Sequence, residues 1–408
     1  MSTDVPDRRD RHTVAVVVAV QAAASMGYFA AMAHVVVHLR DDLGLAAGLI
    51  GLVLALRNLV QYALFLPVGA LADVLNPVRT GVLACALRAV GFALLGTVSS
   101  TAGLVVAAVL LGTGGALFHP AAQSLLAGVA ERRRARGYAA YTITLQISAV
   151  VAPLLGLALL NVGYWLVAAA SAGLWATAAF LFSLVRQVPR APAGGGVVAG
   201  VRTALRDRVF MWFAVVSMPT MLMADQAAVV VPLGGANAGA VTVFSCVLAA
   251  VSAAVQPWCA VGGRAERPAM LRAGMLFVGI GYLLLATGAG GHLAGLVAVA
   301  VLHGFGGGML QPAVFHSIAR LAPPARYGAY LGVRAFFSGL LAFAGGTAVG
   351  RLFELGPTGT ATALVALALI AFASAAAPRA FPGRRTGAES AAPRETPRGE
   401  TVKVGPRG

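Results

Sequence analysis

Residues 112–121 read GTGGALFHPA, and residues 304–313 read GFGGGMLQPA. Each segment sets closely spaced glycines before a proline, and each lies within a long apolar stretch. One pattern recurring in both halves predicts a chain built from two related units. The position before the proline is His119 in the first half and Gln311 in the second. In repeat-built membrane bundles, binding sites lie where the repeats meet, so both positions are candidate site residues.

Composition indicates a membrane protein. Of the 408 residues, 59% are hydrophobic and 11% are charged. Apolar runs of roughly 20 residues, the length of a membrane-spanning helix, recur along the chain. We predict an all-α integral membrane protein with twelve transmembrane helices, arranged as two pseudo-symmetric six-helix bundles. The predicted spans are 14–39, 47–72, 80–99, 102–129, 138–160, 163–185, 209–233, 238–261, 269–289, 292–320, 327–352 and 357–377.

The charge distribution predicts the topology. A formal net charge of +16 would suggest a nucleic-acid partner in a soluble chain. All but five of the 30 Lys and Arg residues, however, lie in the N-terminal segment, alternate loops, the central linker or the C-terminal tail. The positive-inside rule then places both termini and the linker in the cytoplasm. We therefore expect a multi-pass protein of the cytoplasmic (inner) cell membrane, and no nucleic-acid partner.

Five segments follow from these patterns. They are a cytoplasmic N-terminus (1–13), an N-terminal six-helix bundle (14–185), a cytoplasmic linker (186–208), a C-terminal six-helix bundle (209–377) and a cytoplasmic tail (378–408). The linker contains prolines and three consecutive glycines, with a short amphipathic helix expected around 201–209. The tail has few apolar residues, so we expect it to be disordered.

Residues 69–73 read GALAD and are followed by Arg79. This segment resembles the signature between the second and third helices of the major facilitator superfamily. The resemblance implies that Gly69, Asp73 and Arg79 form a cytoplasmic latch, in which the aspartate accepts hydrogen bonds at the start of a neighbouring helix. Alternatively, Asp73 merely ends a helix.

Four further features narrow the resemblance: RNLVQ at 57–61, RAVGF at 88–92, the GGxLFxP segment at 114–120, and Arg334. Over residues 14–377 the chain is similar to MdtH-type multidrug exporters of the drug:proton antiporter branch. That group commonly has carboxylates where this chain has His119 and Gln311. The antiporter signature of the fifth helix is kept only in part, by Pro153 and Gly156.

Prolines and glycines are expected to shape the helices around the site. Pro120 and Pro312 follow the two polar positions, and a proline bends a helix because it lacks the N–H donor. Pro153 is expected to bend the fifth helix, while Gly156 allows a close helix contact.

Charged groups near the bilayer centre cost roughly 2.5 to 3.5 kcal/mol, so each requires a partner or a function. Asp225 is the carboxylate placed deepest in a predicted helix, which makes it the leading candidate for carrying a proton. The alternative is a structural ion pair with one of the arginines. His119 is the second candidate because imidazole titrates near neutral pH, and its alternative is an interhelical hydrogen bond.

Three intramembrane arginines, Arg57, Arg88 and Arg334, leave an excess of positive charge. This excess favours a small amphiphilic substrate with an acidic or zwitterionic group, although Arg57 or Arg88 could instead only join helices. The candidate cavity residues are Arg57, Arg334, Gln311, Tyr28, Phe118 and Gln226.

The expected function is secondary active transport. The chain would export amphiphilic drugs or natural products by proton-coupled alternating access, as a monomer in the lipid bilayer. The alternatives are uptake or exchange of a small metabolite, and a non-transporting membrane sensor. No P-loop, metal-ligand spacing or nucleophile–base constellation is visible, so neither an enzyme nor a cofactor is expected, and the proton gradient is the expected energy source. The three cysteines indicate no disulfide framework or metal site.

Overall fold

The computed structural model describes residues 4–74, 76–185, 197–260, 264, 267–323 and 326–377. Twelve helices in this part of the chain are long and apolar enough to cross a membrane. No β-strand occurs among the described residues. The predicted all-α fold is therefore confirmed, whereas the tail after residue 377 and residues 186–196 of the linker lie outside the described residues.

The N-terminal bundle contains six long helices. They are α1 (Asp4–Val37), α2 (Ala47–Val74), α3 (Pro77–Leu95), α4 (Thr101–Ala127), α5 (Glu131–Leu160) and α6 (Tyr164–Ser183). Helix α1 begins within the segment predicted as an N-terminal extension, and a π-helical turn, His38–Asp42, follows it.

The C-terminal bundle begins after a short helix, α7 (Val197–Arg206), which falls where the amphipathic linker helix was expected. The bundle consists of α8 (Arg208–Ser217), α9 (Pro219–Leu233), α10 (Ala238–Ala260), α11 (Pro268–Ala286), α12 (Leu293–Leu321), α13 (Tyr327–Glu354) and α14 (Gly356–Ala376). The predicted span 209–233 is thus two helices, α8 and α9. Pro219 opens α9 because a proline suits the first turn of a helix and interrupts an existing one.

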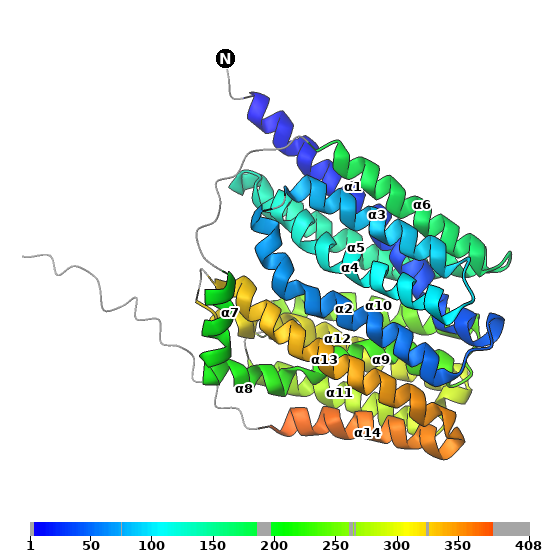
Figure 1. Ribbon diagram of the computed structural model, residues 1–408. Helices are drawn as coiled ribbons and strands as arrows, with labels where there is room; N and C mark the ends of the chain where they lie inside the picture. Colours follow the sequence, from blue (N-terminus) through cyan, green and yellow to red (C-terminus); the bar gives the residue numbers. More distant parts are fainter. Residues whose placement is uncertain are drawn as a thin grey trace, which may run out of the picture.

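The two bundles repeat one packing pattern (Figure 1). Helix α4 packs against α2 and α3, and α12 packs against α10 and α11. Likewise α3 packs against α6, and α11 against α14. Between the bundles, α2 packs along α13 and α5 packs against α10. This pseudo-symmetry confirms the duplication predicted from the two glycine-rich segments.

The repeated glycines allow α4 and α12 to approach their neighbours. A Cβ atom at Gly112 would lie 2.5 Å from the carbonyl oxygen of Arg57 on α2. A Cβ atom at Gly308 would lie 2.8 Å from Cβ of Val255 on α10. Both distances are too short for any other residue, so the glycines are required by close helix packing.

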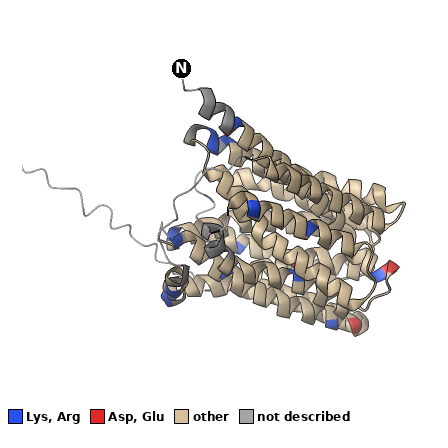
Figure 2. Cartoon of the chain, turned by 45° about the horizontal axis from the view of Figure 1, so that its top comes forward, with Lys and Arg blue, Asp and Glu red and all other residues tan. Residues whose placement is uncertain are grey.

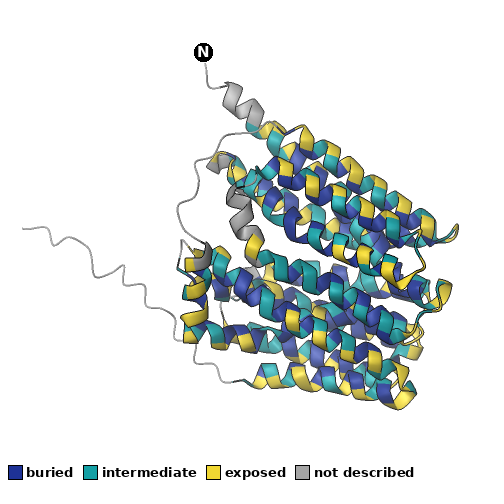
Figure 3. Ribbon diagram, viewed as in Figure 1, coloured by how far each residue is buried: buried dark blue, intermediate teal, exposed yellow. Residues whose placement is uncertain are grey.

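Exposed residues lie along the outer faces of the bundles (Figure 3), and many large apolar residues are among them. Phe180 of α6 and Leu369 of α14, for example, are 64% and 60% exposed. Many charged residues lie toward the two ends of the molecule, both Asp and Glu shown there with them, and a few Lys and Arg lie between the ends (Figure 2). We call the end that carries α7 the linker end, and the opposite end, which carries Arg40 and Glu354, the hairpin end. Apolar sides and charged ends are typical of a protein embedded in a bilayer.

Candidate functional site

Three helices of the N-terminal bundle bring polar side chains together. Arg57 and Gln61 lie one turn apart on α2, Arg88 lies on α3, and Tyr28 lies on α1. Arg57 donates from Nη1 to the Tyr28 hydroxyl and from Nη2 to Gln61 Oε1, each at 3.0 Å. Arg88 Nη2 donates to the same Gln61 oxygen at 3.4 Å. We call these four side chains the arginine cluster.

Aromatic rings surround the two guanidinium groups. The central carbons of Arg57 and Arg88 lie 5.4 and 5.2 Å from the centroid of the Tyr28 ring. Arg88 also lies 4.8 Å from the ring centroid of Trp175 on α6. Cation–π attraction strengthens where water is excluded, and these arginines are only 8% and 5% exposed. The rings thus offset part of the cost of burying two cations.

No carboxylate pairs with the arginine cluster. Among the described residues, neither Arg57 nor Arg88 forms an ion pair, and the Nε atoms of both are buried without an acceptor. Burying unpaired cationic donors is expensive, so such groups usually have a role. The cluster therefore retains hydrogen-bond donors for an additional acceptor.

Gly115 makes room for the cluster. A Cβ atom at this position of α4 would collide with Arg88 Nη2 and with Gln61 Oε1. The second glycine of the GG pair in the opening segment thus faces the side chains of Arg88 and Gln61 rather than a neighbouring backbone.

Asp225 lies on α9 and is half-buried. Its Oδ2 atom is buried without a hydrogen-bond partner, and no ion pair joins the carboxylate to a described residue. Arg57 and Tyr62 of α2, in the other bundle, lie within its electrostatic range. The ion pair left open by the sequence is not formed here. Asp225 thus lies within electrostatic range of Arg57 of the opposite bundle without forming an ion pair with it.

His119 lies beside the arginine cluster on α4. Its Nδ1 atom is 3.0 Å from the hydroxyl of Tyr141 on α5, and its ring meets Phe118 edge to face. The charge of Arg88 also acts on it. The interhelical hydrogen bond expected as the structural alternative for His119 is therefore present.

Arg334 of α13 is buried, with its donors satisfied by the start of the C-terminal bundle. Its Nε donates to the Ser217 hydroxyl at 3.0 Å, and its Nη2 donates to the Ser217 carbonyl at 3.1 Å and to the Thr220 hydroxyl at 2.6 Å. These residues flank the break between α8 and α9. Arg334, proposed from the sequence as a cavity residue, therefore joins α13 to this break.

Three glutamines form a hydrogen-bonded chain across the bundles. Gln146 of α5 donates to Gln256 of α10 at 2.7 Å, and Gln256 donates to Gln311 of α12 at 3.2 Å. Nearby, the Cys246 thiol of α10 donates to the Val150 carbonyl of α5. The polar position of the second repeat, Gln311, thus connects to the N-terminal bundle through one other amide.

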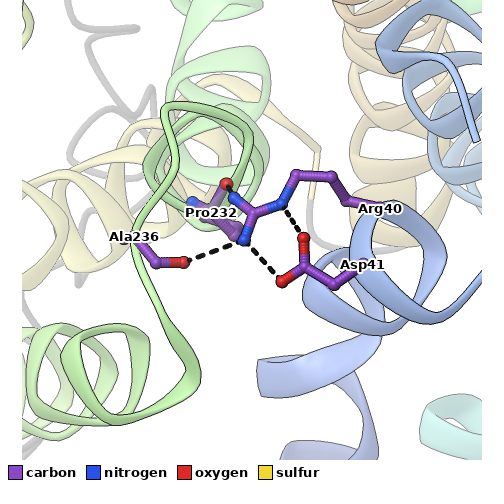
Figure 4. A network of polar contacts seen from close by, with 4 residues as sticks. All are labelled: Arg40, Asp41, Pro232 and Ala236. Atoms are coloured by element: carbon purple, nitrogen blue, oxygen red, sulfur yellow. Dashed lines mark hydrogen bonds and ion pairs between the residues drawn. The ribbon is translucent and has the colours of Figure 1, made fainter. Parts of the chain in front are cut away.

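Arg40 joins the bundles at the hairpin end (Figure 4). Its guanidinium donates to the carbonyl oxygen of Pro232 at the end of α9 and, at 3.4 Å, to that of Ala236. Asp41 accepts two hydrogen bonds of 2.5 and 2.7 Å from the same guanidinium and orients it. We call these four residues the hairpin-end contact.

Helices α2 and α13 close the same end. The backbone N–H of Gly48 donates to Glu354 Oε1 at 2.9 Å. A Cβ atom at Gly51 would lie 2.9 Å from the Gly346 carbonyl oxygen, so the two backbones nearly touch. Farther along, Gly339 packs against the buried Tyr62.

Several remaining predicted residues lie in bundle interiors. Phe118 is buried against Trp175 and Phe182, and Gln226 is buried against Gly346. We therefore assign Phe118 to the core of the N-terminal bundle; it was expected to line the cavity because helix periodicity could not show which face was inward.

Helix-shaping residues fall inside helices as predicted. Pro120, Pro153 and Pro312 interrupt the hydrogen-bond ladders of α4, α5 and α12. The Pro153 carbonyl oxygen lies 3.0 Å from Nε2 of His34 on α1, and a Cβ atom at Gly156 would lie 2.5 Å from the Ala30 carbonyl oxygen. These residues set the close packing of α1 on α5.

The latch remains a prediction. Gly69 and Asp73 lie near the end of α2, but their side chains are outside the described part of the structure, and Arg79 is exposed on α3.

The sequence did not single out Gln61, Gln146, Gln256 or Arg40 as functional. A signal existed for two of them. Gln61 follows Arg57 by four residues and therefore lies on the same helix face. Arg40 is one of two basic residues predicted at the end of the protein that otherwise lacks them.

Comparison with known proteins agrees with this architecture. The family description Major Facilitator Superfamily matches residues 17–240. This chain belongs to the major facilitator superfamily.

Among the described residues, no group of three His, Cys, Asp or Glu side chains is placed to hold a metal ion.

Sequence relatives support the predicted resemblance to MdtH. The multidrug resistance protein MdtH of Aeromonas hydrophila is 28% identical over 337 residues, covering 79% of this chain and 84% of the relative. MdtH of Klebsiella pneumoniae is 28% identical over 344 residues, with 81% and 84% covered. An uncharacterized MFS-type transporter of Mycobacterium tuberculosis is 34% identical over 155 residues, or 38% of this chain. The match covers only 37% of that relative's length.

Solved structures share the fold. A crystal structure of the peptide transporter POT in complex with sulfate has a TM-score of 0.74 at 16% identity, covering 89% of this chain and 92% of that one. A mutant of the nucleoside transporter NupG also has a TM-score of 0.74, at 12% identity, with 89% and 98% covered. At these identities the likeness concerns the fold alone.

Proposed function

We propose that this protein is a secondary active exporter of amphiphilic drugs or natural products, driven by the proton gradient. The observation that carries the proposal is Asp225, an unpaired carboxylate that faces Arg57 of the opposite bundle. The names of the MdtH relatives, which describe multidrug resistance proteins, agree with export of drugs.

Asp225 couples a proton to the movement of the bundles in this proposal. An ionised Asp225 attracts Arg57, whereas a protonated Asp225 does not. Because the two residues belong to different bundles, this attraction changes with the distance between the bundles. Binding or losing a proton therefore shifts the balance between arrangements, as a coupled carrier requires. His119 is the second proposed proton carrier, with Tyr141 as its hydrogen-bond partner.

The proposed orientation has the linker end and both termini in the cytoplasm, and the distribution of basic residues supports it. The hairpin-end contact then closes the outer side of a monomer in the cytoplasmic membrane. The proton gradient replaces a cofactor as the source of energy.

Flux in proteoliposomes tests the proposal. The purified chain is reconstituted, and uptake or release of 2-naphthalenesulfonate, a permanently charged amphiphile, and of ethidium is followed under an imposed gradient of one pH unit. At one proton per substrate, such a gradient supports about a tenfold concentration ratio. We expect at least one probe to move toward the acidic side. Protons should move in the opposite direction, toward the alkaline side, and a pH-sensitive dye trapped inside the liposomes reports this movement.

Two variants locate the coupling. Asp225→Asn should abolish gradient-driven movement, and His119→Ala should leave most of it. Undiminished gradient-driven flux in both variants would remove the proposed proton carriers. Accumulation toward the alkaline side would favour the uptake alternative over export.

A further inference from the structure

We propose that the arginine cluster is the binding site for the anionic group of the substrate. Arg88 would be its principal ligand, and the Gln61 side-chain oxygen would hold the place that a carboxylate occupies in an ordinary buried ion pair. This inference rests on the proposed transport function and names the chemical class of its substrate.

The unused donors of Arg88 are the first argument. A guanidinium carries five N–H donors, and Arg88 uses one of them, in the long hydrogen bond of 3.4 Å from Nη2 to Gln61. Within the described chain, its Nε atom is buried without an acceptor, and the residue is 5% exposed. A buried guanidinium with most donors unsatisfied matches the planar, bidentate geometry of carboxylate, sulfonate or phosphate oxygens.

The second argument is the shared acceptor. Gln61 Oε1 accepts from both arginines, yet an amide oxygen carries no formal charge to balance two cations. The carboxylate of Asp225 lies within electrostatic range of Arg57 but forms no ion pair with it. An incoming anion supplies the missing negative charge and also satisfies the free donors.

The surroundings of the cluster are the third argument. Tyr28 and Gln61 are half-buried rather than sealed in the core. The cluster lies on α1, α2 and α3, opposite Asp225 of α9, so it borders the interface between bundles. Gly115 lets the ends of Arg88 and Gln61 pack directly against α4, because a Cβ atom there would overlap both side chains. These features describe a pre-formed site rather than a helix-joining contact such as that of Arg334, whose Nε and Nη2 both donate to Ser217 or Thr220.

Equilibrium binding to the purified full chain in nanodiscs tests the inference. The probes are 2-naphthalenesulfonate and its neutral analogue 2-naphthalenesulfonamide, which share one apolar body. Hydrogen bonds to charged groups should make the anion bind about tenfold more tightly or better. No gradient is applied, so this result does not depend on export.

Two variants test whether the arginine cluster binds the anion. Arg88→Gln should remove the preference for the anion, with Arg202→Gln, an exposed position on α7, as the control for charge. Gln61→Glu is nearly isosteric and should pair internally with both arginines. It should therefore lose sulfonate binding by about tenfold or more while its thermal midpoint stays equal to or above that of the parent. Asn161→Asp, which adds a carboxylate at an exposed position of the hairpin end, should bind like the parent.

Loss of sulfonate binding in a stable Gln61→Glu protein would support the site, because misfolding could not explain it. Equal affinity for the two probes, sulfonate binding that survives Gln61→Glu, or no sulfonate binding by the parent would each overturn it. A parent that binds the sulfonate but moves it along no gradient would instead overturn the proposed export and leave the anion site standing.

Discussion

Replacing Arg40 with glutamine should open the hairpin end. In the structure, the Arg40 guanidinium spans from the turn after α1 to the carbonyl oxygens of Pro232 and Ala236. Glutamine has a shorter and neutral side chain, so it cannot reach both carbonyls while also pairing with Asp41. The substitution therefore removes a direct contact between the bundles and leaves the α2–α13 packing in place.

The magnitude follows from the bonds that are lost. A hydrogen bond from a charged donor contributes about 1.5 to 3 kcal/mol when it is well buried. The Arg40 side chain is 22% exposed, and the bond to Ala236 is long, at 3.4 Å. We therefore expect a loss of about 2 kcal/mol in the preference for the closed hairpin end, or roughly a 30-fold change in the ratio of closed to open molecules.

Distances between spin labels measure this ratio. Val162 and Leu355 are exposed at the hairpin end, 63% and 69% respectively, and belong to different bundles. Labels attached to cysteines at these positions, in a background with the three native cysteines replaced by alanine, should show a longer distance population in Arg40→Gln. Asp41→Asn should give a smaller shift because it removes the orienting partner but keeps the carbonyl contacts. A distance distribution in Arg40→Gln identical to that of the parent would refute a closing role for Arg40.

Three other substitutions have defined outcomes. Gly112→Ala should destabilise the protein by about 1 to 3 kcal/mol and lower its thermal midpoint, because the added Cβ would lie 2.5 Å from a backbone oxygen. Gly173→Ala should not lower the midpoint, because the space around Gly173 is open. Equal midpoints of the two variants would contradict the packing argument. Arg334→Leu should destabilise the protein by about 2 kcal/mol or more, because three hydrogen bonds to Ser217 and Thr220 are lost, and unchanged thermal unfolding would count against this joint. Asp225→Glu should keep proton-driven flux that Asp225→Asn loses; full flux in the amide variant would exclude a proton on this side chain.

The sequence predicted the fold well because bilayer physics leaves few choices. Apolar runs long enough to span the membrane identified all twelve spans, and the repeated glycines identified the duplication. The break at Met218 was missed because the apolar character continues through it, and only Pro219 marks the change.

The candidate site was only partly predictable. Arg57, Arg88 and Asp225 stood out because a charge in an apolar helix is rare. Gln61 and Gln256 did not, since amides are less exceptional there and their importance comes from partners on other helices. The position of Phe118 could not be predicted either. Its helix is apolar on every side, so the spacing of apolar residues does not show whether the ring points into the bundle or toward the cavity.

The two bundles contribute to the hairpin-end contact in ways that differ in their sensitivity to mutation. Its donor is one side chain, Arg40, but its acceptors on the C-terminal bundle are backbone carbonyls. Replacement of the side chain at position 236 leaves the carbonyl oxygen there in place. Backbone carbonyls also do not become protonated when the medium turns acidic, whereas a carboxylate acceptor would. The two carbonyl acceptors of Arg40 therefore stay available over a wide pH range, and Asp41, the exposed carboxylate of the contact, is the part that acid can protonate.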